Sequence, residues 1–200
     1  MTEVIRCDWC SQDPTYQQYH DHVWGRPVSD AVALFAKLCL DGQQAGLSWI
    51  TILRKQSAYE DAFANFDPDQ LIHFTETDVE RLMGNSGIVR NRLKIRSVIR
   101  NARAFVDMRD ASEDFSYFLW GFVDGQPRIN AWQRHQHIPT ETDESRAMSK
   151  ALKQRGFNFV GPTICYAFMQ ATGLVMDHLC DCHCYQECRN EAESFNLAAL

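Results

Sequence analysis

The chain has 200 residues, of which 45% are hydrophobic and 23% charged, so it is long enough for one well-cored domain and too short for two large ones. Its 10 glycines and 6 prolines exclude collagen-like and broadly disordered architectures. No apolar run approaches the roughly 20 residues that cross a bilayer, and Met1–Cys10 lacks the apolar core of a signal peptide. We therefore expect a soluble, cytoplasmic protein that does not contact a membrane.

Helical spacing of apolar residues dominates the first half of the chain. The pattern predicts an amphipathic helix that begins after Ser29 as its cap and is stopped by Gly42. Four more helices are expected, over about Leu47–Phe66, Pro68–Phe74, Thr77–Met83 and Leu93–Val106.

The second half is less regular until its last third. An aromatic-rich segment, Phe115–Phe122, is expected to pack in the core, and a polar loop follows around Gln133–Asp143. Two further helices are expected over Ser145–Arg155 and Pro162–Thr172, the second with proline at its first position. Because strand signals are nearly absent, we expect an all-α fold, with one domain over residues 1–188 and a C-terminal tail over 189–200.

The formal net charge of −6 argues against nucleic acid as a partner, but the charges are unevenly spread. Six Lys and Arg residues and no acid lie between Gly84 and Val106, which leaves 14 basic against 26 acidic residues elsewhere, or −12. The helical period puts Arg96, Arg100 and Arg103 on the outer face. Exposed charges more than about 8 to 10 Å away are screened, so this basic strip can bind a phosphate backbone. The alternative is an ordinary solvated helix face.

The two C-terminal helices are joined by Gly156–Gly161, a pattern typical of a helix-hairpin-helix motif. Gly161 and Thr163 would lie at a helix N-terminus, where free N–H groups and the positive end of the helix dipole favour an anion such as a DNA phosphate. A glycine-containing turn is common on its own. Combined with Arg96 and Arg100 of the basic strip, it makes DNA binding the leading hypothesis.

Six of the eight cysteines lie near the chain ends: Cys7, Cys10, Cys180, Cys182, Cys184 and Cys188. In a reducing compartment they indicate thiols or metal ligands rather than disulfides. His178 and Cys182 are four residues apart and would face the same way on a helical turn, and Cys7 and His20 form a natural second pair. A Zn²⁺ site built from these four residues would be structural and would join the chain's two ends.

Other cysteines leave that ligand set open. Cys10, Cys180 or Cys184 could replace either cysteine of the set, whereas Cys188 fits best as a reduced thiol in a mobile tail.

Several motifs together resemble one known family: Arg6–Trp9, Tyr16, Tyr19–Asp21, Trp24–Gly25, Gly42–Ile50, Ser86–Arg90, Arg155–Phe157 and Val160–Tyr166. Over about residues 6–185 they resemble the 3-methyladenine-DNA glycosylase I family, and the run from Gly42 to Trp49 is highly specific. The resemblance implies an all-α, helix-hairpin-helix glycosylase with a single catalytic domain over 1–188. It also implies a structural Zn²⁺ held by Cys7, His20, His178 and Cys182.

The resemblance further implies a monofunctional DNA repair enzyme. Such an enzyme hydrolyses the N-glycosidic bond of 3-methyladenine in double-stranded DNA, releases the free base and leaves an abasic site. It must flip the base out of the stack. Because adenine methylated at N3 is cationic, its ring is attracted to the faces of Trp and Tyr, and its charge makes it a good leaving group. The expected base pocket is Trp9, Tyr16, Tyr19, Asp41 and Trp49, with Asp41, Tyr19 and Trp49 as catalytic residues.

Three positions need separate comment. Asp41 stands where the family pattern usually has Glu, which keeps the charge but shortens the side chain by one methylene. Leu47, beside Gly46, is a plausible wedge that fills the gap left by the flipped base, although a core leucine at a helix start is the ordinary alternative. Asp177 is expected to support the metal ligand His178.

Two other functions remain open from the sequence. One is a DNA-binding protein with a zinc site at the joined ends but weak or no activity, suggested by Asp41. The other is a hydrolase of free nucleosides, which would need a purine pocket but not the basic strip. In each case we expect a monomer.

Overall fold

The computed structural model describes residues 4–197, and helices make up most of this range. The α-helices are α1 (Pro14–His22), α2 (Ala31–Gln44), α3 (Trp49–Leu53), α4 (Gln56–Ala62), α5 (Pro68–Leu71), α6 (Glu76–Met83), α7 (Arg92–Asp110), α8 (Phe115–Trp120), α9 (Asp143–Gln154), α10 (Pro162–Ala171) and α11 (Tyr185–Ser194). Short 3-10 helices are η1 (Ala64–Phe66), η2 (Gly121–Val123) and η3 (His135–His137). The expectation of a mostly helical fold is confirmed.

Two short strands were not expected. β1 (Arg128–Ile129) and β2 (Val175–Met176) pair in parallel, with Arg128 opposite Val175 and Ile129 opposite Met176. None of the described helices is both long and apolar enough to span a membrane.

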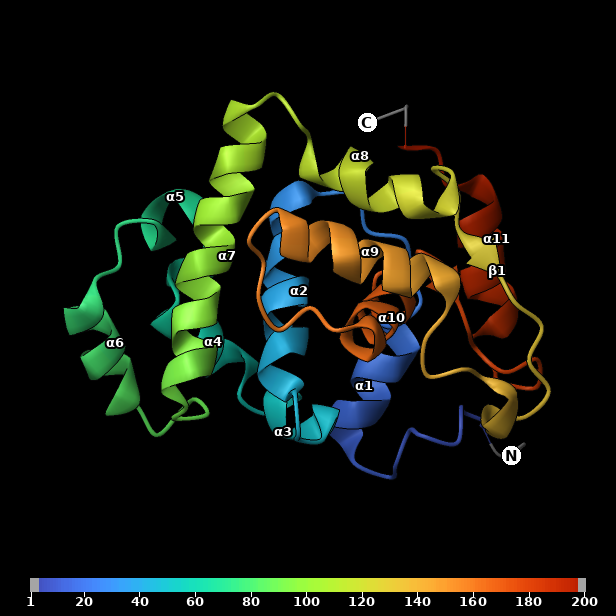
Figure 1. The fold of residues 1–200 in the computed structure, drawn as a ribbon. Helices are drawn as coiled ribbons and strands as arrows, with labels where there is room; N and C mark the ends of the chain where they lie inside the picture. Colours follow the sequence, from blue (N-terminus) through green and yellow to red (C-terminus); the bar gives the residue numbers. More distant parts are fainter. Residues whose placement is uncertain (1–3, 198–200) are drawn as a thin grey trace.

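Helix α2 runs through the middle of the molecule, between α7 on one side and α10 on the other (Figure 1). Its buried face includes Leu34, Phe35 and Leu38, all fully buried. The helix does not stop at Gly42 as the sequence suggested but continues to Gln44. Gly42 is needed for close packing, because a Cβ there would lie 3.2 Å from the Cβ of Phe159. Asp41 therefore lies in the last turns of the central helix.

The long helix expected over Leu47–Phe66 is broken into α3, α4 and η1. Residues 64–66 have positive φ angles of 51° to 56°, which turn the chain sharply. The turn places Phe63 and Phe66 in stacked contact at 5.8 Å between ring centroids, and both rings are buried. Both rings are buried in the turned chain, and this burial offsets the loss of helical continuity.

The two helices of the expected hairpin are confirmed within two residues as α9 and α10. Their connection turns at Gly156, which has a φ of +93° that disfavours other residues. Phe157 and Val160 of the connection are buried and fix it to the core. The N-terminus of α10 begins at Pro162, after Gly161 as its cap.

The expected tail from Arg189 is wrong for the part that is described. Residues 185–194 form α11, which packs against both strands, and Cys188 and Ala192 are buried one turn apart on its inner face. Arg26 holds the helix from the N-terminal side through ion pairs with Glu187 and Glu191. Residues 198–200 lie outside the described range.

The N-terminal segment, residues 5–7, contacts the segment that follows β2. The N–H of His183 donates to the carbonyl of Ile5 at 2.9 Å. Gly25, at a φ of +80°, allows the ring of His178 to approach, since a Cβ there would lie 2.9 Å from two ring atoms. The contact brings α1 next to the segment that follows β2.

Candidate functional site

An aromatic cavity of about 190 Å³ lies where α1, α2, α3 and α10 meet. All five residues of the predicted pocket line it: Trp9, Tyr16, Tyr19, Asp41 and Trp49. Tyr16 and Tyr19 come from α1, Asp41 from α2 and Trp49 from the first turn of α3. Residues from three helices and the N-terminal segment thus converge on one space.

The rings of the cavity support one another. Trp9 lies 5.1 Å from Tyr16 and 5.0 Å from Trp24 between ring centroids, and Tyr19 lies 5.4 Å from Trp49. These are ordinary distances for tilted aromatic pairs. Tyr19 and Trp49 are buried, whereas Trp9 and Tyr16 are half-buried. The arrangement offers aromatic faces to a flat ligand.

Asp41 is the carboxylate of the cavity, and its side chain is only 2% exposed. Burial raises its pKa above the ordinary value, and the ammonium of Lys37 lowers it only in part. Its Oδ2 atom is buried and has no hydrogen-bond partner among the described residues, and the same holds for Nε1 of Trp49. A buried acceptor and a buried donor without partners are costly unless a ligand satisfies them. Both groups therefore suit a polar ligand edge.

Sequence reasoning missed several residues of this cavity: Trp24, Lys37, Gln44, His135, Ile138 and Gln170. Lys37 is the most consequential, because it pairs with Asp41 one helical turn later and its Nζ lies 4.0 Å from the centroid of the Trp49 ring. The four-residue spacing between Lys37 and Asp41 could have revealed this pair, because side chains at that spacing lie on the same helix face. The polar loop before α9 gave no comparable signal for His135.

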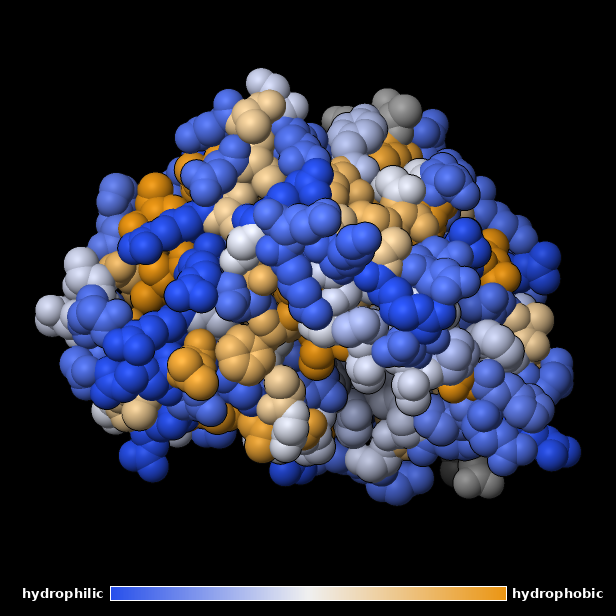
Figure 2. Space-filling view, viewed as in Figure 1, coloured by the Kyte–Doolittle hydropathy of each residue, from blue (hydrophilic) through white to orange (hydrophobic). Residues whose placement is uncertain are grey.

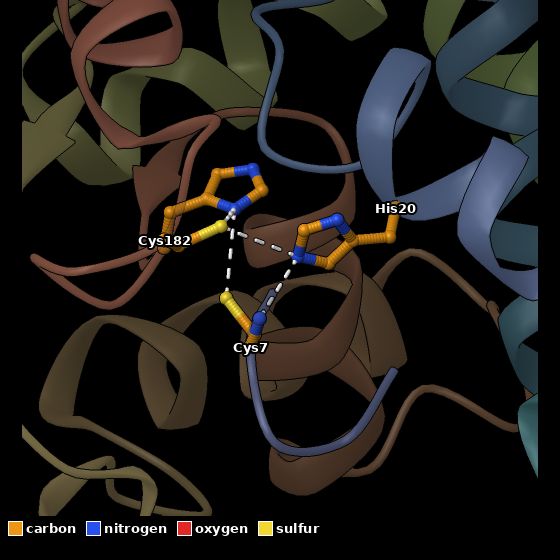
Figure 3. A group of neighbouring side chains, drawn as sticks. Cys7, His20 and Cys182 are labelled. Carbon is orange, nitrogen blue, oxygen red and sulfur yellow. Dashed lines mark hydrogen bonds between the residues drawn. The ribbon is translucent and has the colours of Figure 1, made fainter. Parts of the chain in front are cut away.

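The four predicted metal ligands meet where the N-terminal segment and α1 contact the segment that follows β2. One donor atom from each of Cys7, His20, His178 and Cys182 lies within 4.8 Å of the others, and all four residues are buried. Figure 3 shows the side chains of Cys7, His20 and Cys182 directed toward one another. Cys7 and His20 come from the first part of the sequence, and His178 and Cys182 come from the last part.

The distances between these donors fit a tetrahedral Zn²⁺. Cys182 Sγ lies 3.6 Å from His20 Nε2 and 3.5 Å from His178 Nδ1, and Cys7 Sγ lies 3.6 Å from His178 Nδ1. Ordinary Zn–S and Zn–N bonds at a tetrahedral angle would separate sulfur and nitrogen by about 3.5 Å. Two thiolates and two imidazoles are also the donor types that structural zinc prefers.

The outer nitrogen of each histidine is held as well. His20 Nδ1 lies 2.8 Å from Asp21 Oδ1, and His178 Nε2 lies 3.1 Å from the carbonyl oxygen of Trp24. Such outer contacts fix the tautomer, so that the inner nitrogens carry free lone pairs toward the cluster. Of the alternative cysteines, Cys184 belongs to a second group with His20, Asp21 and His183.

Asp177 does not support His178 as the sequence suggested. It is fully buried and accepts four hydrogen bonds, from Asn130, Trp132, Tyr166 and Gln170, at 2.6 to 2.8 Å. These bonds tie the β1–β2 region to α10 and hold Gln170 in the cavity wall. A carboxylate satisfied in this way needs no metal ligand as its partner.

The basic strip is partly neutralised. Lys94 is buried, and its Nζ donates to the carbonyls of Gln43 and Ala45 at the end of α2, so it caps that helix and is not a surface charge. Arg96 is exposed as expected but forms an ion pair with Glu76. Arg100 is exposed, and Nη1 donates to Asn158 Oδ1 at 3.4 Å. Arg100 therefore lies beside the loop between α9 and α10.

The remaining predicted DNA contacts are at the surface. Gly46 has a φ of +76° with open space around it, and Leu47 is 41% exposed in the turn between α2 and α3. Leu47 is thus not a core leucine. Thr163 is exposed in the first turn of α10, next to half-buried Gly161. Most side chains on the face in Figure 2 are hydrophilic, with small separate hydrophobic patches.

The chain matches a known family along most of its length. Residues 9–185 match the model of the family described as methyladenine glycosylase. DNA-3-methyladenine glycosylase 1 of Escherichia coli K12 is 53% identical over 180 residues, which cover 90% of this chain and 96% of the relative. DNA-3-methyladenine glycosylase of Haemophilus influenzae is 49% identical over 181 residues, which cover 90% and 98%.

Solved structures agree with these relatives. A crystal structure of 3-methyladenine DNA glycosylase I superposes with a TM-score of 0.90 at 54% identity, over 90% of this chain and 100% of that one. A structure of the Staphylococcus aureus protein, described as showing the basis of 3-methyladenine recognition, gives 0.87 at 42% identity, over 89% and 95%. The chain therefore belongs to the methyladenine glycosylase family of enzymes.

Proposed function

We propose that the protein removes 3-methyladenine from DNA by hydrolysing the bond between the base and deoxyribose, which releases the free base and leaves an abasic site. The observation that carries the proposal is the cavity of five Trp and Tyr rings around the buried carboxylate of Asp41. The relatives are named for this activity, and one solved relative is a complex with 3-methyladenine.

The cavity favours a flat, positively charged base. Trp9, Tyr16, Tyr19 and Trp49 offer ring faces, each worth about 0.5 to 2 kcal/mol toward a cation depending on desolvation. Asp41 Oδ2, which has no partner within residues 4–197, can accept a hydrogen bond from the amino group on the adenine edge. Normal adenine carries no positive charge and gains less from the same groups.

The charge of the base also supplies the chemical activation. A base that is already cationic leaves without protonation, so the site needs little general acid catalysis. Asp41, Tyr19 and Trp49 are the catalytic candidates because they surround the place where the departing base would sit. Their task is to hold the flipped base and to stabilise the positive charge shared by base and sugar in the transition state.

Double-stranded DNA would be held at the surface near the cavity. The first turn of α10, with Gly161 and Thr163, presents backbone N–H groups to a phosphate, and Arg100 adds charge beside it. Arg96 adds charge only if its pair with Glu76 opens. Exposed Leu47 beside Gly46 would fill the gap left by the flipped base.

A structural Zn²⁺ held by Cys7, His20, His178 and Cys182 belongs to the same proposal. When bound, it supplies a closed four-ligand link between the two ends of the chain and no open position for catalysis. The link bears on the cavity because His20 lies on α1 beside Tyr19. We propose that the protein acts as a monomer.

The proposal is tested by incubating the protein with methylated double-stranded DNA and separating the released bases by chromatography. We expect free 3-methyladenine together with an equal number of abasic sites. A DNA-binding protein of weak or no activity would retain the DNA without releasing base. A nucleoside hydrolase would act on the free nucleoside and would not lose activity when Arg100 is neutralised.

A further inference from the structure

The ammonium of Lys37 contacts the same groups that the proposed function assigns to the positively charged base. Its ammonium donates to Asp41 Oδ1 and lies 4.0 Å from the centroid of the Trp49 ring. The side chain is only 15% exposed, and the stem rises from α2 one turn before Asp41. The protein without substrate therefore already holds a cation against the same carboxylate and the same indole.

A cationic base and this ammonium cannot share the site in its present arrangement. The two groups compete for the Trp49 face, and both draw on the single negative charge of Asp41. Two positive charges a few ångströms apart repel strongly where water is excluded. Neither charge is screened by salt to the extent that surface charges are. Entry of a cationic base thus requires the ammonium to leave the aromatic cavity.

A second cavity provides the place to which it can move. This cavity, of about 410 Å³, is also lined by Lys37 and shares Tyr19, Trp49 and Ala171 with the aromatic cavity as well. Lysine has a flexible four-carbon stem, so rotation of the side chain carries the ammonium from one space to the other.

The second cavity also contains an acid. Glu60 of α4 lines it, half-buried, and accepts a hydrogen bond from Gln56 Nε2 at 2.8 Å. Among the residues that line this cavity, Glu60 is the carboxylate that can take over the ammonium when it leaves Asp41.

We propose that Lys37 is a specificity-determining residue of the base pocket, a resident cation that pairs with Asp41 in the free protein and moves toward Glu60 when a cationic base enters. The inference rests on the proposed function, because it concerns the charge of the bound base. A neutral purine meets no charge repulsion from Lys37. Lys37 therefore weakens the binding of charged bases without weakening that of uncharged bases. It lowers the ratio of the two affinities.

The test is a pair of binding titrations followed by tryptophan fluorescence. The charged probe is 3,9-dimethyladeninium, which is cationic at pH 7, and the probe that is neutral at pH 7 is 9-methyladenine. The variants are Lys37→Met, which keeps the length of the stem without its charge, and Lys37→Gln as a second neutral side chain. Lys150→Met on exposed α9 is the matched control for loss of a lysine. Thermal melting checks that each variant is folded.

We expect Lys37→Met and Lys37→Gln to bind the cationic probe about tenfold more tightly than the unchanged protein, a change of about 1.4 kcal/mol. Affinity for 9-methyladenine should change by less than about twofold. Glu60→Gln should weaken binding of the cation several-fold when Lys37 is present and have no effect in the Lys37→Met background.

Equal affinity for the cation with and without Lys37 would overturn the inference. An equal gain in affinity for both probes would overturn it as well. The lysine would then act by occupying volume in the pocket and not by its charge. If neither probe bound to any variant, the proposed function itself would be contradicted and the inference would fall with it. Binding of both probes with no effect of Lys37 would leave the proposed function standing.

Discussion

Asn101 of α7 and Asn158 of the loop between α9 and α10 are joined by two hydrogen bonds in opposite directions. The N–H of Asn158 donates to Asn101 Oδ1 at 2.8 Å, and Asn101 Nδ2 donates to the carbonyl of Asn158 at 3.2 Å. Asn101 is buried. One side chain thus fixes the loop that precedes α10 against the helix that carries Arg100.

Asn101→Ala should lower the free energy of unfolding by about 1 to 3 kcal/mol, because it leaves two part-buried backbone groups of the loop without these partners. The measurement is urea denaturation followed by circular dichroism. Asn190→Ala on the exposed face of α11 serves as the control and should change stability by less than about 0.5 kcal/mol. Equal stability of the two variants would show that the loop does not depend on this pair.

Arg100→Gln should weaken binding to undamaged double-stranded DNA several-fold and should reduce the slope of log affinity against log salt by about one. The reason is that Arg100 lies beside the loop before α10 and forms no ion pair with a described carboxylate. Fluorescence anisotropy at several salt concentrations measures both quantities. Arg189→Gln, on α11, is the control and should leave the slope unchanged.

The proposed Zn²⁺ site includes Cys182 and excludes Cys10, so substitutions of these two cysteines should have different effects. Cys182→Ser should abolish the binding of about one Zn²⁺ per chain. It should also lower the Tm by about 10 °C or more, because a Zn²⁺ ion that binds only the folded state no longer stabilises it. Cys10→Ser, outside both described donor groups, should keep the metal and the Tm. Metal analysis measures the zinc content of each variant, and differential scanning fluorimetry measures its Tm. A full complement of zinc in the Cys182 variant would refute the proposed ligand set.

Activity should depend on the ionisation of Asp41. Burial raises the pKa of this carboxyl, so activity should fall, as pH drops, at a higher pH than the value of about 3.9 for an ordinary aspartate. Lys37 lowers the pKa of Asp41 in part. Lys37→Met removes that effect, and the acidic limb of a plot of kcat/KM against pH should move to higher pH.

The other titratable groups facing Asp41 and Lys37 in the cavity are Tyr16, Tyr19 and His135. Burial raises the pKa of both tyrosines, so they stay neutral throughout the acidic range. His135→Asn in the same assay removes the remaining group. An acidic limb that follows His135 and ignores Lys37 would assign the dependence to the histidine.

Lys37 also bears on the expected product. Its ammonium is paired with Asp41 inside the base cavity, and an amine must be neutral and face the sugar to form a Schiff base. We therefore expect no covalent complex with DNA after borohydride treatment during turnover, and abasic strands that stay uncut until alkali is added. A trapped complex that disappears in Lys37→Met would contradict a purely hydrolytic reaction.

How far the sequence predicts the fold depends on the kind of signal. Apolar spacing placed α7, α9 and α10 well because their periodicity is long and regular. It failed over Leu47–Phe66, where local periodicity says nothing of the left-handed turn that buries Phe63 and Phe66. It failed again after Arg189, because the short apolar pair of α11 lies on a helix whose packing partners, including β1 and β2, come from other parts of the chain.

The sequence also predicted some residues of the site and missed others. Residues matched by motif, such as Trp9, Asp41 and Trp49, lie together in the cavity, and the spacing of His178 and Cys182 does bring two donors together. Lys37 was missed because a lysine on an amphipathic helix is read as solvent-exposed. Lys94 was counted among the six basic residues of the strip, because charge alone does not reveal that it caps the carbonyls of α2.

The central claim is that Asp41 and the aromatic rings around it select and release the charged base. Release of 3-methyladenine from methylated DNA under single-turnover conditions tests it most directly. We expect Asp41→Asn to slow release by about a hundredfold and Trp49→Ala by about tenfold or more, with the fold intact. Tyr117→Phe, at an exposed position of α8, should release base at the unchanged rate. Unchanged rates in folded Asp41→Asn and Trp49→Ala would contradict the account.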